Sequence, residues 1–188
     1  MIEDNRLLTA FKSGNSAAFG TLARKYQDRI YNLCRHMLAD PDDSHDAAQD
    51  VFVKAFQGLK DFTPNSTFYT WLYRIAVNTC LDYQRKFSLR SFFFPTGNEE
   101  HLNIFPSPMP SPEAAYADRQ SMEALAVAMQ RLSGKLRAII ILKELEGLSY
   151  EEIAAILDVS VGTVKSRISR ARVELKKYMQ KSTEQKRV

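Results

Sequence analysis

The chain has 188 residues, 45% of them hydrophobic and 26% charged, which suffices for one ordinary domain or two small ones with buried cores. No apolar run approaches the roughly 20 residues of a membrane span, and the N-terminus lacks a signal-peptide core. We therefore expect a cytoplasmic protein with no membrane span of its own. The net charge is +4, but residues 160–188 carry nine basic and two acidic side chains. This local charge favours a polyanionic partner, although a solvated basic tail has the same composition.

The first segment with a clear helical pattern covers residues 45–59. Ahead of it, residues 40–44 (DPDDS) predict the end of one helix and the cap of the next. At 100° per residue, one face is apolar and is expected in a core: Ala48, Val51, Phe52, Ala55 and Leu59. The opposite face is acidic and rich in amides, with one exposed valine: Asp46, Gln49, Asp50, Val53 and Gln57. Periodicity leaves two interpretations open, a solvated face or a docking surface for a basic protein partner.

Residues 68–86, FYTWLYRIAVNTCLDYQRK, predict a second helix with two distinct faces. One face is expected in the core: Phe68, Leu72, Ile75, Ala76, Thr79 and Tyr83. A separate arc, about 60° wide, carries Trp71, Arg74, Asn78 and Arg85. This arc suits unstacked nucleic-acid bases, because rings and guanidinium groups stack on bases and a carboxamide hydrogen-bonds to their edges. The alternative is a half-buried Trp71 that packs on the surface of the neighbouring domain.

Five of the seven prolines lie between Pro95 and Pro112, which predicts an extended linker because proline neither continues a helix nor donates a backbone hydrogen bond. Helical spacing dominates on both sides of it. We therefore predict an all-α protein of two small helical domains, residues 1–90 and 113–188, joined by a flexible linker at 91–112. Residues 111–113 (SPE) predict the start of the next helix, with a serine cap, a proline at the first helical position and an acidic residue in the first turn.

The C-terminal region predicts a helix-turn-helix. Ser133 is a candidate cap for a helix that ends at Gly147, and Ser149 with Glu152 forms a capping-box pattern. After a turn at residues 158–160, a last helix has the buried stripe Val161, Val164, Ile168, Ala171 and Leu175. Its outer face and flanks are polar and basic: Gly162, Thr163, Lys165, Ser166, Arg167, Ser169, Arg170 and Arg172. This pattern favours insertion into a DNA major groove, and the alternative is a helical hairpin with a solvated face.

Catalytic patterns are missing from the sequence. It has no metal-spaced carboxylates, no nucleophile paired with a base and no glycine-rich phosphate loop, so we expect neither an enzyme nor a cofactor. The acidic cluster at residues 40–43 is interpreted as a helix cap rather than a Mg²⁺ site. Cys34 and Cys80 lack the spacing of a zinc site and are expected to be buried thiols.

Three motifs together resemble one family. DAAQDVFVKAFQGL, FYTWLYRIAVNTCLDYQRK and LSYEEIAAILDVSVGTVKSRISRARVELKK, in this order around a variable linker, resemble regions 2.2, 2.3–2.4 and 4.2 of extracytoplasmic-function (ECF) sigma factors of bacterial RNA polymerase. The sigma-E type is the most similar. The resemblance covers roughly residues 16–86 and 119–177.

The resemblance implies roles for the residues at matching positions. Asp46, Gln49, Asp50 and Val53 match the residues that bind the β′ clamp helices of core polymerase. Trp71, Arg74, Asn78 and Arg85 match the residues that open and recognise the −10 element. The loop at residues 61–67 is expected to form the rest of the base pocket. Recognition of the −35 element falls to Thr163, Lys165, Ser166, Arg167, Ser169 and Arg170. Ser169 and Lys165 replace a phenylalanine and an arginine of related proteins, so we expect a different −35 sequence.

The function implied by the resemblance is that of a sigma factor, which directs promoter recognition, DNA melting and transcription initiation. The expected partners are core RNA polymerase, through its β′ and β subunits, promoter DNA, and an anti-sigma factor that holds the protein inactive. The alternative from the residues alone is a helix-turn-helix regulator that acts on duplex DNA without being a polymerase subunit. That alternative leaves the arc from Trp71 to Arg85 and the acidic face of residues 46–53 unexplained.

Overall fold

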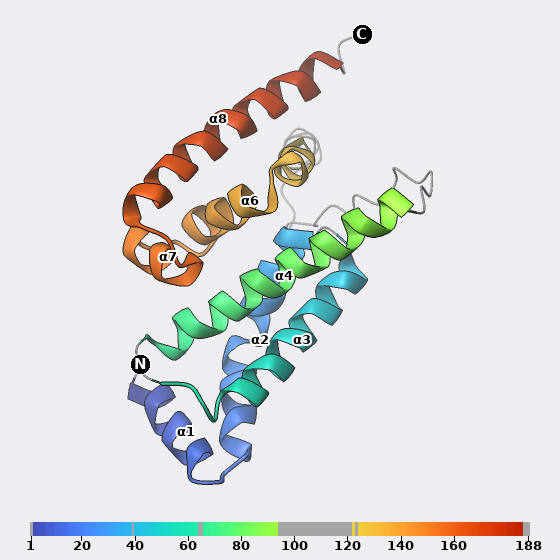
Figure 1. The fold of residues 1–188 in the computed structure, drawn as a ribbon. Helices are drawn as coiled ribbons and strands as arrows, with labels where there is room; N and C mark the ends of the chain where they lie inside the picture. The colour runs from blue at the N-terminus through green and yellow to red at the C-terminus, as the bar shows by residue number, and fades with distance from the viewer. Residues whose placement is uncertain (1, 39, 64–65, 94–121, 123, 186–188) are drawn as a thin grey trace, which may run out of the picture.

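The fold is entirely helical in the part of the chain that the structure describes, which comprises residues 2–38, 40–63, 66–93, 122 and 124–185 of a computed structural model. The prediction of two helical domains is confirmed, with one group of helices on each side of the predicted linker (Figure 1). Residues 94–121, which hold the prolines of that linker and the predicted helix start at 111–113, lie outside the described residues.

Four helices form the N-terminal bundle: α1 (Ile2–Lys12), α2 (Ala17–Leu38), α3 (Pro41–Gly58) and α4 (Phe68–Phe93). The predicted boundary before α3 is confirmed. The Asp40 carboxylate accepts a hydrogen bond from the Asp43 backbone N–H at 2.9 Å, and Pro41 occupies the first turn. Such a cap satisfies one of the donors that every helix leaves free at its N-terminus, which fixes where α3 starts and hence where its acidic face lies.

The C-terminal group comprises a helical segment at residues 124–131, then α6 (Gly134–Ile140), the π-helical η1 (Ile141–Leu145), α7 (Tyr150–Leu157) and α8 (Val161–Gln185). Ser133 holds the predicted N-cap position of α6, although its side chain makes no capping hydrogen bond. The predicted end is confirmed at Gly147, whose φ of +68° is a left-handed conformation that glycine adopts without steric cost.

The helix-turn-helix is confirmed in its local chemistry. Ser149 and Glu152 form a complete capping box at the start of α7, with Ser149 Oγ accepting from the Glu152 N–H at 3.1 Å. Asp158 ends α7 in the left-handed conformation. Ser160 Oγ accepts from the Thr163 N–H at 3.1 Å and so caps α8. These three local interactions fix the turn that orients α8.

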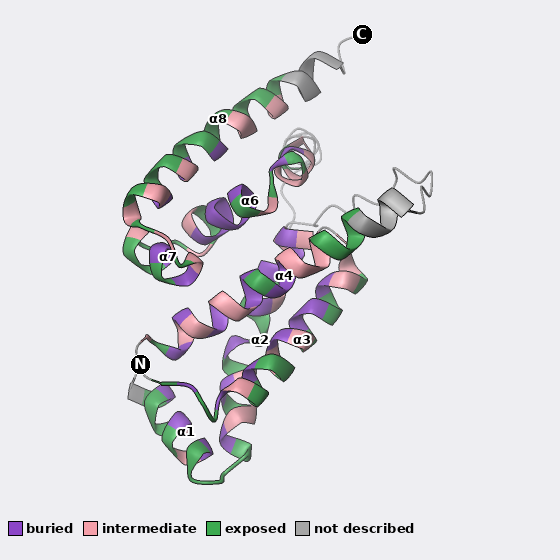
Figure 2. Cartoon of the chain, in the orientation of Figure 1, coloured by how far each residue is buried: buried purple, intermediate pink, exposed green. Residues whose placement is uncertain are grey.

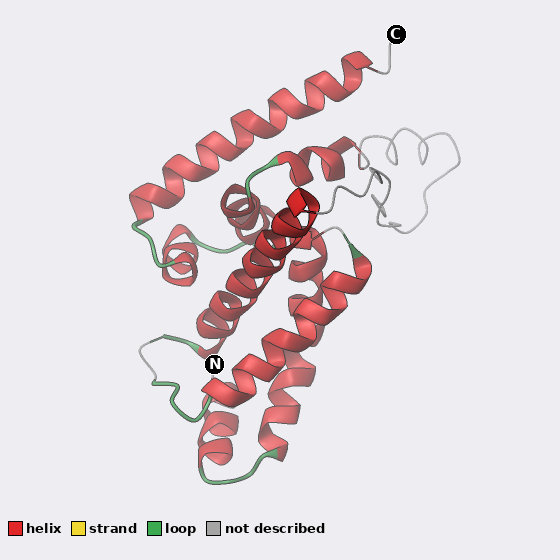
Figure 3. Cartoon of the chain, turned by 45° about the vertical axis from the view of Figure 1, so that its right-hand side comes forward, coloured by secondary structure: helices red, strands yellow, loops and turns green. Residues whose placement is uncertain are grey.

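Helix α4 occupies the centre of the molecule, between α2 and α3 on one side and α6 and α7 on the other (Figures 1 and 3). The predicted core face is confirmed for Phe68, Leu72, Ala76 and Thr79, which are buried. A second set on α4 is also buried, namely Cys80, which was predicted as a buried thiol, and Tyr73 and Val77, which the sequence did not predict. Burial on α4 therefore extends beyond the predicted core face (Figure 2), because α2 packs against Cys80 and the C-terminal group contacts Tyr73.

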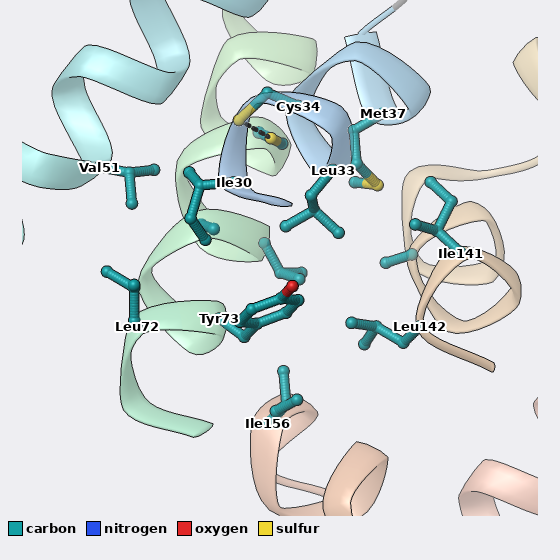
Figure 4. Packing of buried hydrophobic residues seen from close by; sticks show 14 of the residues in the cluster. Ile30, Leu33, Cys34, Met37, Val51, Leu72, Tyr73, Ile141, Leu142 and Ile156 are labelled. Carbon is teal, nitrogen blue, oxygen red and sulfur yellow. Dashed lines mark hydrogen bonds between the residues drawn. The ribbon is translucent and has the colours of Figure 1, made fainter. Parts of the chain in front are cut away.

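The two thiols are buried, as predicted. Cys34 on α2 and Cys80 on α4 are free cysteines with no solvent exposure, and their sulfur atoms are 3.6 Å apart. They help to pack α2 against α4 beside Ile30 and Leu33 (Figure 4). Buried thiols of this kind behave mainly as small apolar side chains.

Buried tyrosines predict that the fold weakens in alkali. Burial, reinforced by hydrogen bonds to Asp4 and Asp50, raises the pKa of Tyr26 and that of Tyr83 to about 12, and burial also raises the pKa of Tyr73. In the unfolded chain these hydroxyls ionise near pH 10. Above that pH the folded state holds more protons than the unfolded state, so the free energy of unfolding decreases as the pH rises from about 10 to 12.

Urea unfolding at pH 8, 9, 10 and 11 measures this effect. We expect similar unfolding free energies at pH 8 and 9 and a steady loss above pH 10, with a shallower loss in the Tyr83→Phe variant. Equal free energies at pH 8 and pH 11 would contradict the assignment.

Candidate nucleic-acid interface

Trp71 lies at the N-terminal end of α4, half-buried among aromatic side chains. Its ring centroid is 5.1 Å from that of Phe62 and 5.9 Å from that of Phe68. On its other side it lies against Gly58, where an added Cβ would come within 3.3 Å of the indole. The indole is therefore half-buried, but these contacts lie within its own bundle and not on the neighbouring domain, and part of its surface is left accessible.

The other three residues of the predicted arc differ in their surroundings. Asn78 and Arg85 are exposed, and Arg85 pairs with Asp82 one turn earlier on the same helix. Arg74 is half-buried because its Nη2 donates to the backbone oxygen of Ala155 on α7 at 2.5 Å. Its Nε is buried and has no hydrogen-bond partner among the described residues. Within the arc, Asn78 and Arg85 are thus exposed, whereas Arg74 is partly covered by α7.

The loop before α4 is the predicted remainder of the base pocket. Phe62 in this loop is buried, and its backbone oxygen accepts a hydrogen bond from Lys12 Nζ at 2.5 Å. Thr67 Oγ1 caps α4 by accepting from the Thr70 N–H at 3.1 Å. Residues 64 and 65 lie outside the described residues. Both ends of the loop are therefore fixed beside Trp71.

The outer face of α8 is available to a ligand. The buried stripe of the prediction is confirmed at Val164, Ile168 and Ala171, and the polar residues lie on the opposite side. Five of these are exposed, Lys165, Ser166, Ser169, Arg170 and Arg172, and two are half-buried, Thr163 and Arg167. A basic, small-residue surface at the start of a helix-turn-helix recognition helix fits the width of a major groove.

Two of the basic residues on α8 make local contacts. Arg170 Nε donates to Glu174 Oε1 at 2.9 Å, one turn later on the exposed surface. Lys165 Nζ lies 5.9 Å from the ring centre of Tyr150 on α7. Exposed contacts of this kind are weak and exchange readily for phosphate or base contacts.

The acidic face of α3 lies on the surface as predicted. Asp46 and Gln49 are exposed, and Val53 is 53% exposed, a high value for a valine. Asp50 is half-buried, and its Oδ2 accepts a hydrogen bond from the Tyr83 hydroxyl at 3.0 Å. The result is a rigid surface with a negative edge and an apolar centre.

Sequence reasoning missed two features. Phe56 is 43% exposed at the edge of the α3 face, with ring contacts to Phe11 and Phe19. The sequence did contain a signal for this exposure, because Phe56 lies outside the predicted core arc of residues 45–59. The second feature is Tyr73, which is fully buried and donates to Glu146 Oε2 at 2.6 Å. No local pattern marks this pair, because 73 residues separate its partners.

The described residues hold neither a metal cluster nor a membrane-spanning helix. In that part of the chain no three His, Cys, Asp or Glu side chains gather as a metal site would require. No described helix is long and apolar enough to cross a membrane. The features that remain are an exposed helix-turn-helix, a partly covered aromatic and polar arc on α4, and an acidic exposed face on α3, and the first of these is typical of a DNA-binding protein.

Comparison with known proteins agrees with this class. The family described as Sigma-70 region 2 matches residues 22–89, and Sigma-70, region 4 matches residues 122–175. The RNA polymerase sigma-H factor of Pseudomonas aeruginosa is 36% identical over 187 residues, covering 95% of this chain and 94% of that protein. The ECF RNA polymerase sigma-E factor of Escherichia coli is 36% identical over 178 residues, covering 91% of each.

Two solved structures are similar to the whole fold. CnrH in complex with the cytosolic domain of CnrY has a TM-score of 0.68 at 29% identity, covering 95% of this chain and 97% of that one. The sigma factor RpoE of Bartonella quintana in complex with the anti-sigma factor NepR has a TM-score of 0.69 at 26% identity, covering 86% and 96%. The chain belongs to the sigma-70 family, as an ECF RNA polymerase sigma factor of the sigma-E type.

Proposed function

We propose that this chain binds core RNA polymerase and directs it to promoters, with the three surfaces acting in sequence. The α3 face, comprising Asp46, Gln49, Asp50 and Val53 together with Phe56, docks on the β′ clamp helices. The outer face of α8 binds the −35 duplex. The arc on α4 then captures bases of the −10 strand as the duplex opens, and capture offsets the few kcal/mol that each unstacked base costs.

One observation carries this proposal: exposed Asn78 and half-buried Trp71 lie on one rigid helix, while the basic face of α8 lies on another. A protein that binds only duplex DNA requires the basic face of α8 but does not require the exposed arc on α4. The sigma-factor function therefore accounts for more of the surface than the alternative of a helix-turn-helix regulator.

The domain boundaries and the partners follow the same proposal. Residues 1–90 form the polymerase-binding and −10 domain, residues 113–188 form the −35 domain, and residues 91–112 connect them. CnrH and the Bartonella RpoE were each solved with a second protein, in the latter case a named anti-sigma factor. We infer an anti-sigma factor for this chain as well. It acts as a non-catalytic initiation factor in the cytoplasm, where the polymerase works.

Binding to core polymerase tests the proposal directly. The purified chain is expected to co-elute with core polymerase on size exclusion and to confer transcription on a promoter-bearing template. Failure to bind the core enzyme would instead favour a regulator that acts on duplex DNA alone.

Arg170→Ala tests recognition of the −35 element. Each specific base contact contributes about 1–3 kcal/mol, so we expect roughly 5- to 100-fold weaker binding at the −35 site and a relaxed sequence preference. A promoter-library transcription assay with the holoenzyme measures both quantities. Arg24→Ala, which removes an exposed arginine on α2, is the matched control. An unchanged promoter profile in Arg170→Ala would show that this side chain does not contact bases.

A further inference from the structure

The last turn of α1 contacts the loop that precedes α4 (Figure 1). Lys12 Nζ donates to the backbone oxygen of Phe62 at 2.5 Å and lies 5.8 Å from the centre of the Phe62 ring. The same ring lies 5.1 Å from the indole of Trp71. One buried residue, Phe62, therefore stands between a lysine of α1 and the aromatic side chain of the arc on α4.

The end of α1 is fixed, and this fixes the backbone at Lys12. Gly14 has a φ of +102°, and the N–H groups of Gly14 and Asn15 donate back to oxygens of the last turn at 3.0 Å each. These two bonds form a Schellman motif, which ends a helix in a defined conformation. In the same turn, the ring of Phe11 lies 5.4 Å from that of Phe56 on α3. Lys12 therefore projects from a turn that is held against the bundle.

The start of α1 is bound to the same residue of α2 as the start of α4. The Asp4 carboxylate accepts hydrogen bonds from Lys25 Nζ at 2.6 Å and from the Tyr26 hydroxyl at 2.8 Å, both on α2. The Tyr26 ring also lies 5.6 Å from the ring of Phe68, the first residue of α4. Because α1 and α4 share this support, the two helices have a defined position relative to each other.

The hydrogen bond to the Phe62 oxygen determines the direction in which the chain continues. A peptide group is planar, so the direction of this oxygen sets the orientation of the whole peptide unit that joins Phe62 to Thr63. On the other side of the residue, the Phe62 N–H donates to the Leu59 oxygen at 3.3 Å. Lys12 thus completes the restraint at the point where the loop leaves the turn after α3.

We propose that Lys12 is a positioning residue of the −10 site. By holding the Phe62 oxygen from α1, it sets the path of the loop at residues 61–67 and the orientation of Trp71, and so determines which base the pocket accepts. Lys12 acts through Phe62 and does not itself contact a base. The inference rests on the proposed function, because the loop has a base to select only if the arc on α4 binds DNA.

The exposed position of Lys12 offers a second way in which it could affect DNA binding, namely a direct contact with a phosphate. The two roles predict different results. Loss of a phosphate contact weakens binding to every sequence alike and reduces its dependence on salt. Loss of a positioning contact alters the preference among bases, and it changes the surroundings of Trp71 even without DNA.

Fluorescence of the free chain measures the positioning directly, because Trp71 is the single tryptophan of the sequence. Lys12→Met keeps the length of the side chain but removes the donor. We expect red-shifted emission and stronger quenching by acrylamide, since the Phe62 ring no longer covers the indole in one fixed place. Lys12→Arg keeps a charged N–H donor and is expected to retain the emission of the unmodified chain.

Lys60→Met is the matched control, because Lys60 is an exposed lysine just before the same loop. This substitution removes the same charge and leaves the hydrogen bond from Lys12 to Phe62 in place. Its emission and quenching are expected to equal those of the unmodified chain. Circular dichroism verifies that each variant keeps its helices.

Transcription from a promoter library with the holoenzyme measures base choice. A specific base contact discriminates about 5- to 100-fold, so we expect Lys12→Met to lower the preference for the favoured −10 base about fivefold or more. The −35 preference and the affinity for core polymerase should not change, and Lys12→Arg should restore the −10 preference.

The outcomes separate this inference from the proposed function. Unchanged emission and quenching in Lys12→Met overturn the positioning of Trp71, even if transcription is normal. Altered emission with an unchanged −10 preference overturns the role in base choice. An equal loss at every −10 sequence, with a weaker salt dependence, shows a phosphate contact and overturns the inference as well. Failure of the unmodified chain to bind core polymerase counts against the proposed function, whereas the fluorescence of the free chain still decides whether Lys12 positions Trp71.

Discussion

Replacing Asn78 by alanine is expected to reduce open-complex formation about 5- to 100-fold while core polymerase still binds normally. Asn78 is exposed on α4 one turn beyond Arg74, so the substitution removes no packing and leaves the bundle intact. An amide that hydrogen-bonds to a flipped base contributes about 1–3 kcal/mol, and this contribution exists only after the base has left the stack. The substitution should therefore reduce strand opening and leave formation of the closed complex unchanged.

Permanganate footprinting of the promoter measures opening, and gel filtration with core polymerase measures binding. Asn32→Ala is the matched control, because Asn32 is an exposed asparagine on α2, away from the proposed DNA path. Loss of core binding in Asn78→Ala, or normal opening, would contradict the role assigned to this side chain.

Reversing the charge on α3 is expected to abolish holoenzyme formation. The double variant Asp46→Lys, Gln49→Lys places two cations on the surface that is proposed to meet basic clamp residues. Like charges brought together at an interface cost several kcal/mol, so we expect at least a 100-fold loss of affinity for core polymerase. Both positions are exposed, and the buried face of α3 is untouched, so the helix content should not change.

Asp28→Lys supplies the control for this charge reversal, because Asp28 is an equally exposed aspartate on α2. Fluorescence anisotropy of the labelled chain with core polymerase gives both affinities. The α3 assignment would be wrong if the double variant bound core polymerase as tightly as Asp28→Lys.

The sequence predicted those features that depend on neighbours within about four residues. The caps at Asp40 and Ser149 formed as expected because a side-chain oxygen and the backbone N–H that it accepts from lie in the same turn. The same reasoning placed the polar face of α8, since the direction of a side chain on a regular helix follows from its position in the sequence.

Contacts between distant segments could not be predicted in this way. The burial of Tyr73 on α4 depends on its meeting Glu146, and the covering of Arg74 depends on its meeting Ala155. An arginine on a polar arc has the same local pattern whether solvent or another helix lies opposite it. The sequence therefore predicted the chemistry of the candidate site but not that α7 covers part of it.

Run-off transcription with purified core polymerase on a randomised promoter library is the most direct test of the central claim that this chain directs promoter opening. The account predicts transcripts that depend on the chain and start downstream of two enriched elements, and their yield should fall sharply with Asn78→Ala. Transcription no higher than that of core polymerase alone, across the whole library, would contradict it.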